Sequence, residues 1–380
     1  MDTRVAEILD KEVDRQSSTI ELIASENFAS RSVMALCGSV FTNKYAEGYS
    51  GKRYYNGCTH MDEIEDLAIN ELTKLYKCKF ANVQPHSGVN ANTAVYQAFM
   101  KPGQLLMGMD LASGGHLSHG AKPTLSGKVY NSVTYGVDKD GYLDYHYIGG
   151  LAKQWCPKVI VAGASAYPRQ IDWKAFRDIA DSIGAILVVD MAHYSGLIAG
   201  EAYDSPLPYA DVVTSTTHKT LRGPRGGMIL WNNPDFTKRI NSSIFPGTQG
   251  GPLMNIIAAK AQCYIEANTD EFKEYSKQVV KNAQAMALSF SQYGMKVLTD
   301  GTDSHIILLD LSDFKYSGRE AADLLEANGI TVNKNGVPND PRNFIETSGI
   351  RIGTAAETTR GQREYWFREL AQKIVNILKN

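Results

Sequence analysis

The residue best placed for covalent chemistry is Lys219, which lies in the segment Thr214-Ser-Thr-Thr-His-Lys-Thr-Leu-Arg-Gly-Pro-Arg-Gly-Gly227. This segment follows an apolar run, with hydroxyl side chains before the lysine and glycines and arginines after it. The hydroxyls can orient the amine or bind a phosphate, and the glycines let the backbone approach a cofactor held as an imine. The alternative is a polar turn with a solvated lysine, because such turns commonly follow strands. Lys219 alone does not decide between the two.

A carboxylate ends a second apolar run, Ile186-Leu-Val-Val-Asp190. An acidic residue at the carboxyl end of a parallel strand faces the crevice in which such folds bind ligands. Asp190 could pair with a protonated pyridine nitrogen, or it could cap the next helix. Lys219 and Asp190 together favour pyridoxal phosphate (PLP), because this cofactor needs both an imine-forming lysine and an acidic partner for its ring.

Two segments could supply the hydrogen-bond donors that a cofactor phosphate needs. Gln84-Pro-His-Ser-Gly-Val-Asn-Ala-Asn92 should join a strand to a helix whose free N–H groups can meet an anion. Phe245-Pro-Gly-Thr-Gln-Gly-Gly251 is the second candidate, although it can also be interpreted as an ordinary glycine loop. Neither G-x-x-x-x-G-K-[ST] nor G-x-G-x-x-G occurs between a strand and a helix, so a nucleotide site is not predicted.

His116, His119 and Arg351 are further candidates for contact with ligands. The two histidines are spaced as metal ligands could be, but a third ligand is missing, so the sequence predicts no metal site. His116 could instead stack on a flat cofactor. Arg351 lies in an apolar strand pattern, where an unpaired guanidinium would be costly to bury. Either a substrate carboxylate or an internal Asp or Glu would have to balance its charge.

The hydrophobic pattern predicts the framework that positions these residues. Apolar runs typical of strands buried on both faces lie at 80–84, 105–108, 158–162, 186–190, 211–214 and 228–231. Helical patterns such as 173–183 alternate with them, which indicates an α/β fold with a mostly parallel sheet. From about residue 270 the pattern changes to a long helix that continues through Gln292, and then to mixed strands, such as 330–332, and helices. We therefore expect an N-terminal arm helix over 1–16, a large cofactor-binding domain over 17–269 and a smaller α+β domain over 270–380.

The composition is that of a globular protein, with 43% hydrophobic and 21% charged residues among 380. The formal net charge of −2 gives no general attraction to nucleic acid or an anionic membrane. The five cysteines form no C-x-x-C pair, which favours reduced thiols. A signal-peptide pattern is missing, and the apolar runs are shorter than the roughly 18 residues of a membrane span. We therefore expect a cytoplasmic protein.

Further motifs give the chain a specific resemblance to the serine hydroxymethyltransferase family of fold-type I PLP enzymes. The similarity runs from Glu21 to about Gly361. The matching motifs are Glu21-Leu-Ile-Ala-Ser-Glu-Asn27, Asn43-Lys-Tyr-Ala-Glu-Gly-Tyr49, Gly51-Lys-Arg-Tyr-Tyr55, Val161-Ala-Gly-Ala-Ser-Ala-Tyr167 and Ser348-Gly-Ile-Arg-Ile-Gly-Thr354. The resemblance implies interconversion of L-serine plus tetrahydrofolate with glycine plus 5,10-methylenetetrahydrofolate, with PLP as cofactor.

The resemblance also implies roles at the cofactor. Lys219 would hold PLP as an imine, Asp190 would pair with the pyridinium nitrogen, and His116 would stack on the ring. The phenolic oxygen of the ring would be approached by His193 and Ser165. The phosphate would be bound by Ser87, Gly88 and His218, and by Gly250 and Gly251 of a neighbouring subunit.

At the substrate, the resemblance implies that Arg351 and Ser25 bind the amino-acid carboxylate. Glu47 would act as the acid/base near the substrate hydroxyl, and Tyr45, Tyr55 and Arg225 would shape the site. Glu47 and the two tyrosines would come from the partner chain. A homodimer would therefore be the smallest active unit, and a tetramer would be compatible with it.

Positions near the expected folate site keep a second interpretation open. The residues that match folate-contacting positions are retained: Leu111, Gly115, Leu117 and Asn335. Phe344-Ile-Glu346, however, departs from the family pattern, and a carboxylate in that pocket could repel the glutamate tail of folate or could point to solvent. The alternative is a folate-independent PLP aldolase or transaldolase acting on glycine or β-hydroxy amino acids. An inactive homologue would be expected to lack Lys219, Asp190 or Glu47, and all three are present.

Overall fold

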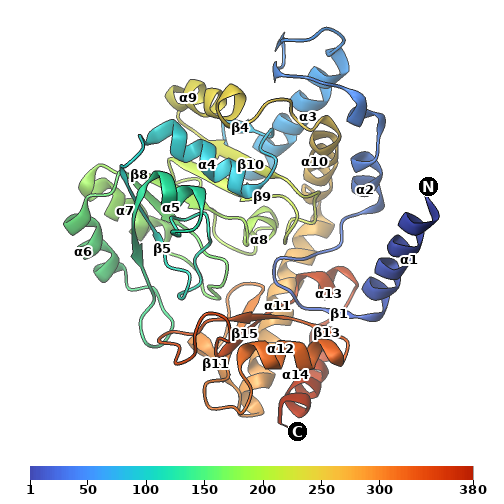
Figure 1. Cartoon of the computed structure of the whole chain (residues 1–380), viewed down its shortest axis with the longest axis vertical. Helices are drawn as coiled ribbons and strands as arrows, with labels where there is room; N and C mark the ends of the chain where they lie inside the picture. Colours follow the sequence, from blue (N-terminus) through green and yellow to red (C-terminus); the bar gives the residue numbers. More distant parts are fainter. Residues whose placement is uncertain (380) are drawn as a thin grey trace.

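The computed structural model describes residues 1–379, which form two main sheets with helices packed around them (Figure 1). The larger sheet has seven strands in the order β4-β10-β9-β8-β7-β5-β6. Its strands are β4 (Phe80–Asn82), β5 (Leu105–Met109), β6 (Asn131–Tyr135), β7 (Val159–Ala162), β8 (Ile186–Asp190), β9 (Val212–Thr216) and β10 (Gly227–Trp231). Neighbours from β9 to β6 are parallel, whereas β10 is antiparallel to β9 and β4. The mostly parallel α/β sheet is thus confirmed.

Helices cover both faces of this sheet, which is why its central strands are almost entirely buried. Val188 points to the face on which α4 (Gly88–Phe99) and α9 (Thr237–Ser242) pack. Leu187 and Val189 point to the opposite face, toward α3 (Thr59–Tyr76), α7 (Trp173–Ile183) and α10 (Met254–Ala267). The edge strand β6 was not predicted, because most of its side chains are exposed and its sequence is correspondingly polar.

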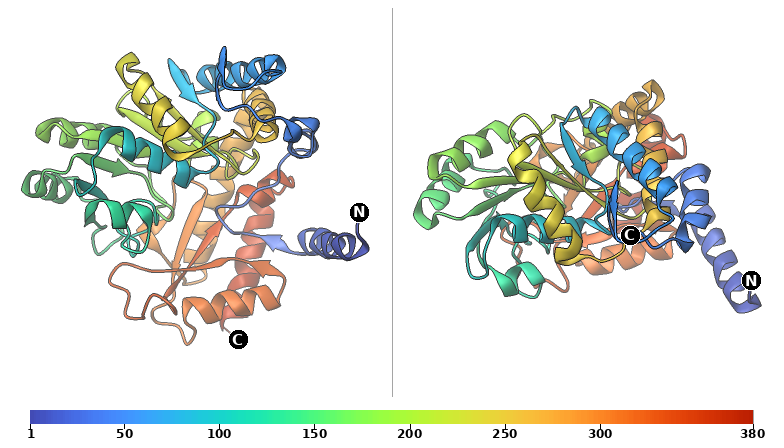
Figure 2. Two further views of the ribbon diagram at one scale, coloured as in Figure 1. Left: turned by 45° about the horizontal axis from the view of Figure 1, so that its top comes forward. Right: turned by 90° about the horizontal axis from the view of Figure 1, so that it is seen from above.

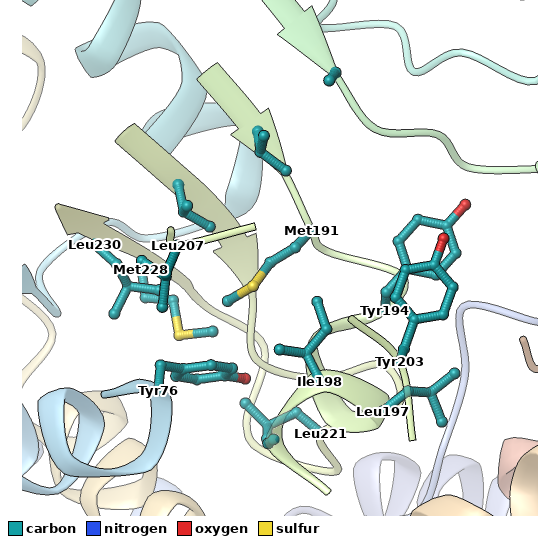
Figure 3. Packing of buried hydrophobic residues seen from close by; sticks show 14 of the residues in the cluster. Tyr76, Met191, Tyr194, Leu197, Ile198, Tyr203, Leu207, Leu221, Met228 and Leu230 are labelled. Atoms are coloured by element: carbon teal, nitrogen blue, oxygen red, sulfur yellow. The ribbon is translucent and has the colours of Figure 1, made fainter. Parts of the chain in front are cut away.

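A hydrophobic cluster lies beneath the ends of the central strands (Figure 3). Met191 follows β8, and Leu197 and Ile198 belong to the short helix α8 (Ser195–Ala199). The rings of Tyr194 and Tyr203 stack with centroids 4.6 Å apart. This packing holds in place the chain that leaves β8 immediately after Asp190.

The second sheet lies beyond the long helix α11 (Asp270–Gln292), whose bounds match the prediction. It is antiparallel, in the order β11 (Lys296–Val297), β12 (Ile306–Asp310), β15 (Gly349–Gly353) and β14 (Asn333–Asn335). Helices α12 (Gly318–Ala327) and α14 (Glu364–Lys379) contribute to a separate hydrophobic core with it. The strand expected at 330–332 is β13 (Ile330–Thr331), but it pairs with β1 (Ile20–Glu21) and not with this sheet. The domain boundary near residue 270 stays a prediction.

Helix α1 (Thr3–Ser18) extends away from the rest of the molecule (Figure 2). It has no buried residue, and Val5, Ile8, Leu9 and Val13 are each at least half exposed. These four residues follow the spacing of one helix face, which we call the α1 stripe. Among residues 1–379, none of the helices combines the length and apolar character needed to cross a membrane.

Candidate active site

A cavity of about 350 Å³ lies at the carboxyl ends of the central strands. Residues from every part of the predicted cofactor and carboxylate sites line it: Ser25, Ser87, Gly88, His116, Ser165, Asp190, His193, His218, Lys219, Arg225 and Arg351. The chain thus brings together side chains that are more than three hundred positions apart in sequence. Tyr45, Glu47, Tyr55, Gly250 and Gly251 do not line it.

Lys219 lies three residues beyond β9, in a loop closed by hydrogen bonds between Thr217 and both Gly223 and Gly226. It is 8% exposed, so the alternative of a solvated lysine is wrong. Its amine makes no hydrogen bond or ion pair within residues 1–379. Burial, with the nearby charges of Arg351 and Arg225, lowers the pKa of Lys219 to about 8 although Asp190 opposes the shift. A lowered pKa makes the free amine available for attack on a carbonyl.

Asp190 is the last residue of β8, and its carboxylate is fully engaged. Oδ2 accepts hydrogen bonds from Asn92 Nδ2 at 2.8 Å and from His119 Nε2 at 2.9 Å, while Oδ1 accepts from Ala192 N at 3.1 Å. Burial alone would raise the pKa of Asp190, but the hydrogen bonds and positive charge of His119 hold it well below its usual range. Helix α8 begins only at Ser195, so the alternative that Asp190 caps the next helix is wrong.

Sequence analysis missed His119 and Asn92 as partners of Asp190. Asn92 is itself oriented by Thr214, whose hydroxyl donates to Asn92 Oδ1 at 2.6 Å. The spacing of His119 after His116 was the available signal, but it suggested a metal. Among residues 1–379, no three His, Cys, Asp or Glu side chains are grouped so that they could hold a metal ion.

His116 and His193 are neutral rings at the cavity. Burial lowers the pKa of His116 to about 4, and its Nδ1 lies 2.8 Å from Ser118 Oγ. Burial also places the pKa of His193 well below its ordinary value. Next to His193 lies His305, a third residue that was not predicted from the sequence, with the two ring centroids 5.5 Å apart and the rings stacked. Uncharged flat rings suit contact with an aromatic cofactor.

The start of α4 has the features of an anion site. Ser87 is its N-cap, and a Cβ added to Gly88 would lie 2.7 Å from Thr216 Cγ2, so glycine lets the helix begin against the end of β9. His218 Nδ1 is buried without a hydrogen-bond partner in the described chain. An unsatisfied ring nitrogen and a helix N-terminus facing one cavity fit the phosphate of PLP. Asn90 accepts a hydrogen bond from the Ser87 hydroxyl at 2.7 Å.

Arg351 is buried in β15 without an acidic partner. Its Nε donates to Asn333 Oδ1 at 3.0 Å, and its Nη1 donates to the Ser165 carbonyl at 2.6 Å. It forms no ion pair with any described carboxylate in residues 1–379, so the alternative of an internal Asp or Glu partner is not found. Since Nη2 is left unpaired and the residue lines the cavity beside Ser25, the guanidinium can receive a carboxylate.

The remaining predicted catalytic and phosphate-binding residues form a separate group, which we call the Glu47 cluster: Tyr45, Glu47, Tyr55, Gly250 and Gly251. Tyr45 Oη lies 3.5 Å from Glu47 Oε1, and the rings of Tyr45 and Tyr55 meet edge to face at 5.3 Å. A Cβ on Gly250 would lie 3.2 Å from Glu47 Oε1, and one on Gly251 would lie 2.9 Å from the Tyr45 ring. Tyr45 and Tyr55 are 56% and 47% exposed. The cluster is assembled but lies outside the cavity of its own chain.

The residues expected near folate do not line the cavity: Leu111, Gly115, Leu117 and Asn335. Leu117 is half exposed, and a Cβ on Gly115 would lie 2.0 Å from the Met109 carbonyl, so glycine is required there for packing. Glu346 accepts a hydrogen bond from Ser317 Oγ at 3.0 Å and pairs with Arg319 at 3.4 Å. Its charge is therefore balanced by the start of α12.

The fold and the cavity together define a PLP-dependent enzyme of fold type I. The family described as serine hydroxymethyltransferase matches residues 1–374, and the chain belongs to this family. Enzymes of the family use PLP, with tetrahydrofolate as a cosubstrate.

Curated relatives named serine hydroxymethyltransferase match the whole chain. Those of Wolbachia sp. subsp. Drosophila simulans (strain wRi) and Wolbachia pipientis wMel are each 55% identical over 379 residues, which is 100% of this chain and 89% of the relative. That of a Nitratiruptor species is 54% identical over 379 residues, covering 100% of this chain and 91% of the relative. The family resemblance drawn from the motifs is thus confirmed.

Proposed function

We propose that this chain interconverts L-serine plus tetrahydrofolate with glycine plus 5,10-methylenetetrahydrofolate at the Lys219 cavity. The observation that carries the proposal is one cavity lined by Lys219, Asp190 and Arg351. They supply a buried amine without a hydrogen bond, an ionised carboxylate and a guanidinium without an ion pair among residues 1–379. The amine can bind the aldehyde of PLP, and the carboxylate can pair with its ring nitrogen. The guanidinium can bind the substrate carboxylate.

Bound PLP supplies an electron sink for the negative charge that develops at the substrate Cα. Lys219 Nζ is the amine that would hold the cofactor aldehyde. Asp190 would keep a proton on the ring nitrogen, and it stays ionised because His119 and Asn92 hydrogen-bond to it. His116 would cover the ring, while His193 and Ser165 would contact the phenolic oxygen.

Arg351 and Ser25 orient the amino acid. Asn333 and the Ser165 carbonyl fix the guanidinium plane, so the carboxylate is bound in one orientation. A fixed carboxylate determines which bond at Cα lies perpendicular to the cofactor ring. The phosphate is bound by Ser87, Gly88 and His218, and Arg225 adds positive charge at the rim of the cavity.

We assign proton transfer at the serine hydroxyl to Glu47 of a partner subunit. The exposure of Tyr45 and Tyr55 supports this assignment, because the cluster does not line the cavity of its own chain and is accessible to a second chain. Tyr45 and Tyr55 would shape the site beside it, and Gly250 and Gly251 would contact the phosphate. The exposed α1 stripe gives a dimer a further apolar surface to bury. A homodimer is therefore the smallest active unit in this proposal, and a tetramer remains compatible with it.

Tetrahydrofolate would be received near Leu111, Gly115, Leu117 and Asn335. The ion pair between Glu346 and Arg319 removes the charge argument for a folate-independent aldolase. We also propose a cytoplasmic location, which the five free cysteines support.

Turnover of L-serine tests the proposal. Purified protein supplied with PLP and L-serine should form glycine and 5,10-methylenetetrahydrofolate only when tetrahydrofolate is present. Lys219→Ala is the control and should form neither product. Glycine formation at an equal rate without tetrahydrofolate would favour the aldolase, and no glycine at all would contradict both functions.

A further inference from the structure

Lys260 is a buried lysine outside the cavity whose amine contacts only backbone carbonyls. It lies in the middle of α10 and is 1% exposed. Its Nζ donates to Val83 O at 2.6 Å, to Pro85 O at 3.0 Å and to Gly227 O at 2.8 Å. Three acceptors require three N–H bonds, which only the ammonium form of lysine has. The geometry therefore calls for a positive charge at a fully buried position.

This charge lacks a contacting counter-ion within residues 1–379. The negative charge of Glu65 raises the pKa of Lys260, but Glu65 already forms an ion pair with Arg53 and accepts a hydrogen bond from Gln84. Burial lowers the pKa of Lys260 to about 7. A buried ammonium without an ion pair is costly unless negative charge lies close by. An anion near the three carbonyls would supply that charge.

The three carbonyls belong to the two segments that support the start of α4. Val83 and Pro85 precede the N-cap Ser87, and Gly227 is the first residue of β10. Gly227 N donates to Pro85 O at 3.0 Å, and a Cβ on Gly227 would lie 2.2 Å from Ser87 O. The two segments are thus in direct contact, and the Lys260 amine donates hydrogen bonds to both of them. Ser87 and Gly88 line the cavity, whereas Lys260 does not.

Carbonyl oxygens carry partial negative charge, so three of them converging behind an anion site would weaken anion binding. The ammonium cancels their effect and leaves a net positive charge behind the helix start. It also holds the backbone of both segments, which fixes the direction of the N–H groups of Ser87 and Gly88. Both effects favour a phosphate at this end of the cavity.

We infer that Lys260 is a positioning residue for the phosphate group of the cofactor, acting through the Val83–Pro85 segment and Gly227. The inference rests on the proposed function, in which Ser87, Gly88 and His218 bind that phosphate. Lys260 touches neither cofactor nor substrate, so its effect should depend on whether the ligand carries a phosphate.

Binding of PLP and of pyridoxal to the cofactor-free protein tests this role. Lys260→Met removes the three donors but keeps an unbranched side chain of similar length. We expect its dissociation constant for PLP to rise about tenfold or more, with that for pyridoxal changed less than about twofold. Inorganic phosphate should also raise the melting temperature of the wild-type protein more than that of the variant. Equal weakening of PLP and pyridoxal binding, or no weakening of either, would overturn the inference.

Gly226→Ala is a second variant that keeps the lysine but displaces it. The added Cβ would lie 2.4 Å from Lys260 Cε and 3.1 Å from Nζ, so the amine must move. Gly226→Ala should also weaken the binding of PLP more than the binding of pyridoxal. This variant provides the test if Lys260→Met does not fold. The exposed Lys277→Met is the matched control and should bind both ligands like the wild type. If the wild type binds no PLP, the proposed function fails; if it binds PLP and only the selectivity is missing, the role of Lys260 alone fails.

Discussion

His119 Nε2 donates a hydrogen bond to Asp190 Oδ2 across 2.9 Å, and both side chains are buried at the end of β8. The contact makes the charge state of Asp190 depend on a neighbouring histidine that also lines the cavity. Burial disfavours the ionised form of Asp190, so removing the groups that donate hydrogen bonds to it should raise its pKa.

His119→Phe keeps a ring of similar size but removes the donor to Asp190. We expect kcat for serine cleavage to fall about 10- to 100-fold, because a loosely held, less acidic partner stabilises the ring charge less well. Asp190 must be ionised to act, so a raised pKa should move the acid limb of the kcat profile to higher pH. An unchanged acid limb with an unchanged kcat would show that His119 has no such role.

Arg351→Lys should impair binding of the amino acid more than the chemical step. Lysine keeps the charge but cannot hold Asn333, the Ser165 carbonyl and a substrate carboxylate in one plane. We expect KM for serine to rise about 10- to 100-fold with a smaller change in kcat. Arg319→Lys, which changes an exposed arginine, should leave KM unchanged. A KM equal to that of the wild type in Arg351→Lys would place the carboxylate elsewhere.

Mixed subunits test whether the Glu47 cluster acts in a partner chain. Lys219→Ala and Glu47→Gln should each be inactive alone. In a dimer that contains one chain of each variant, one of the two sites would have an intact Lys219 and an intact Glu47. About half of the dimers in an equal mixture are of this kind, so activity should return to about a quarter of the wild-type value. No recovery in dimers shown to contain both chains would mean that Glu47 serves its own chain or no site.

Buried histidines predict how the stability of the cofactor-free protein depends on pH. Burial lowers the pKa of His116 to about 4, and it lowers those of His218 and His305 to about 3. The unfolded chain takes up protons at these residues near pH 6.5 while the folded chain does not, so stability falls as the pH drops below about 6.5. Each histidine contributes up to about 1.4 kcal/mol per pH unit between its two pKa values.

Urea unfolding at about pH 7 and about pH 5.5 measures this dependence. We expect a lower free energy of unfolding at the lower pH and a shallower dependence in His305→Gln, which removes one of the groups. Equal stability at the two pH values would show that the histidines take up protons in the folded protein.

The parts of the fold that follow from local pattern could be predicted from the sequence. β8 and α11 have the predicted bounds, because each is a continuous pattern that ends at a polar or helix-breaking change. β6 was missed since an edge strand lacks the apolar run of a buried one. Asp190 and Arg351 stood out because each places charge in an apolar context, and Lys219 stood out because hydroxyl residues precede it and glycines follow it.

Residues that act through distant partners could not be predicted in the same way. His119 is 71 positions from Asp190, and Lys260 is 177 positions from Val83. Neither His119 nor Lys260 lies in a motif that indicates its role, and Lys260 is one polar residue in a mostly apolar helix. Such contacts depend on how strands and helices meet in space, which local periodicity does not encode.

The most direct test of the central claim is a spectral titration of the PLP-loaded protein with glycine, with and without tetrahydrofolate. The account predicts that glycine binds at the Lys219 cavity and that tetrahydrofolate strengthens a long-wavelength absorption band, because both ligands share one site. A band that grows with glycine but does not respond to tetrahydrofolate would contradict the hydroxymethyltransferase assignment.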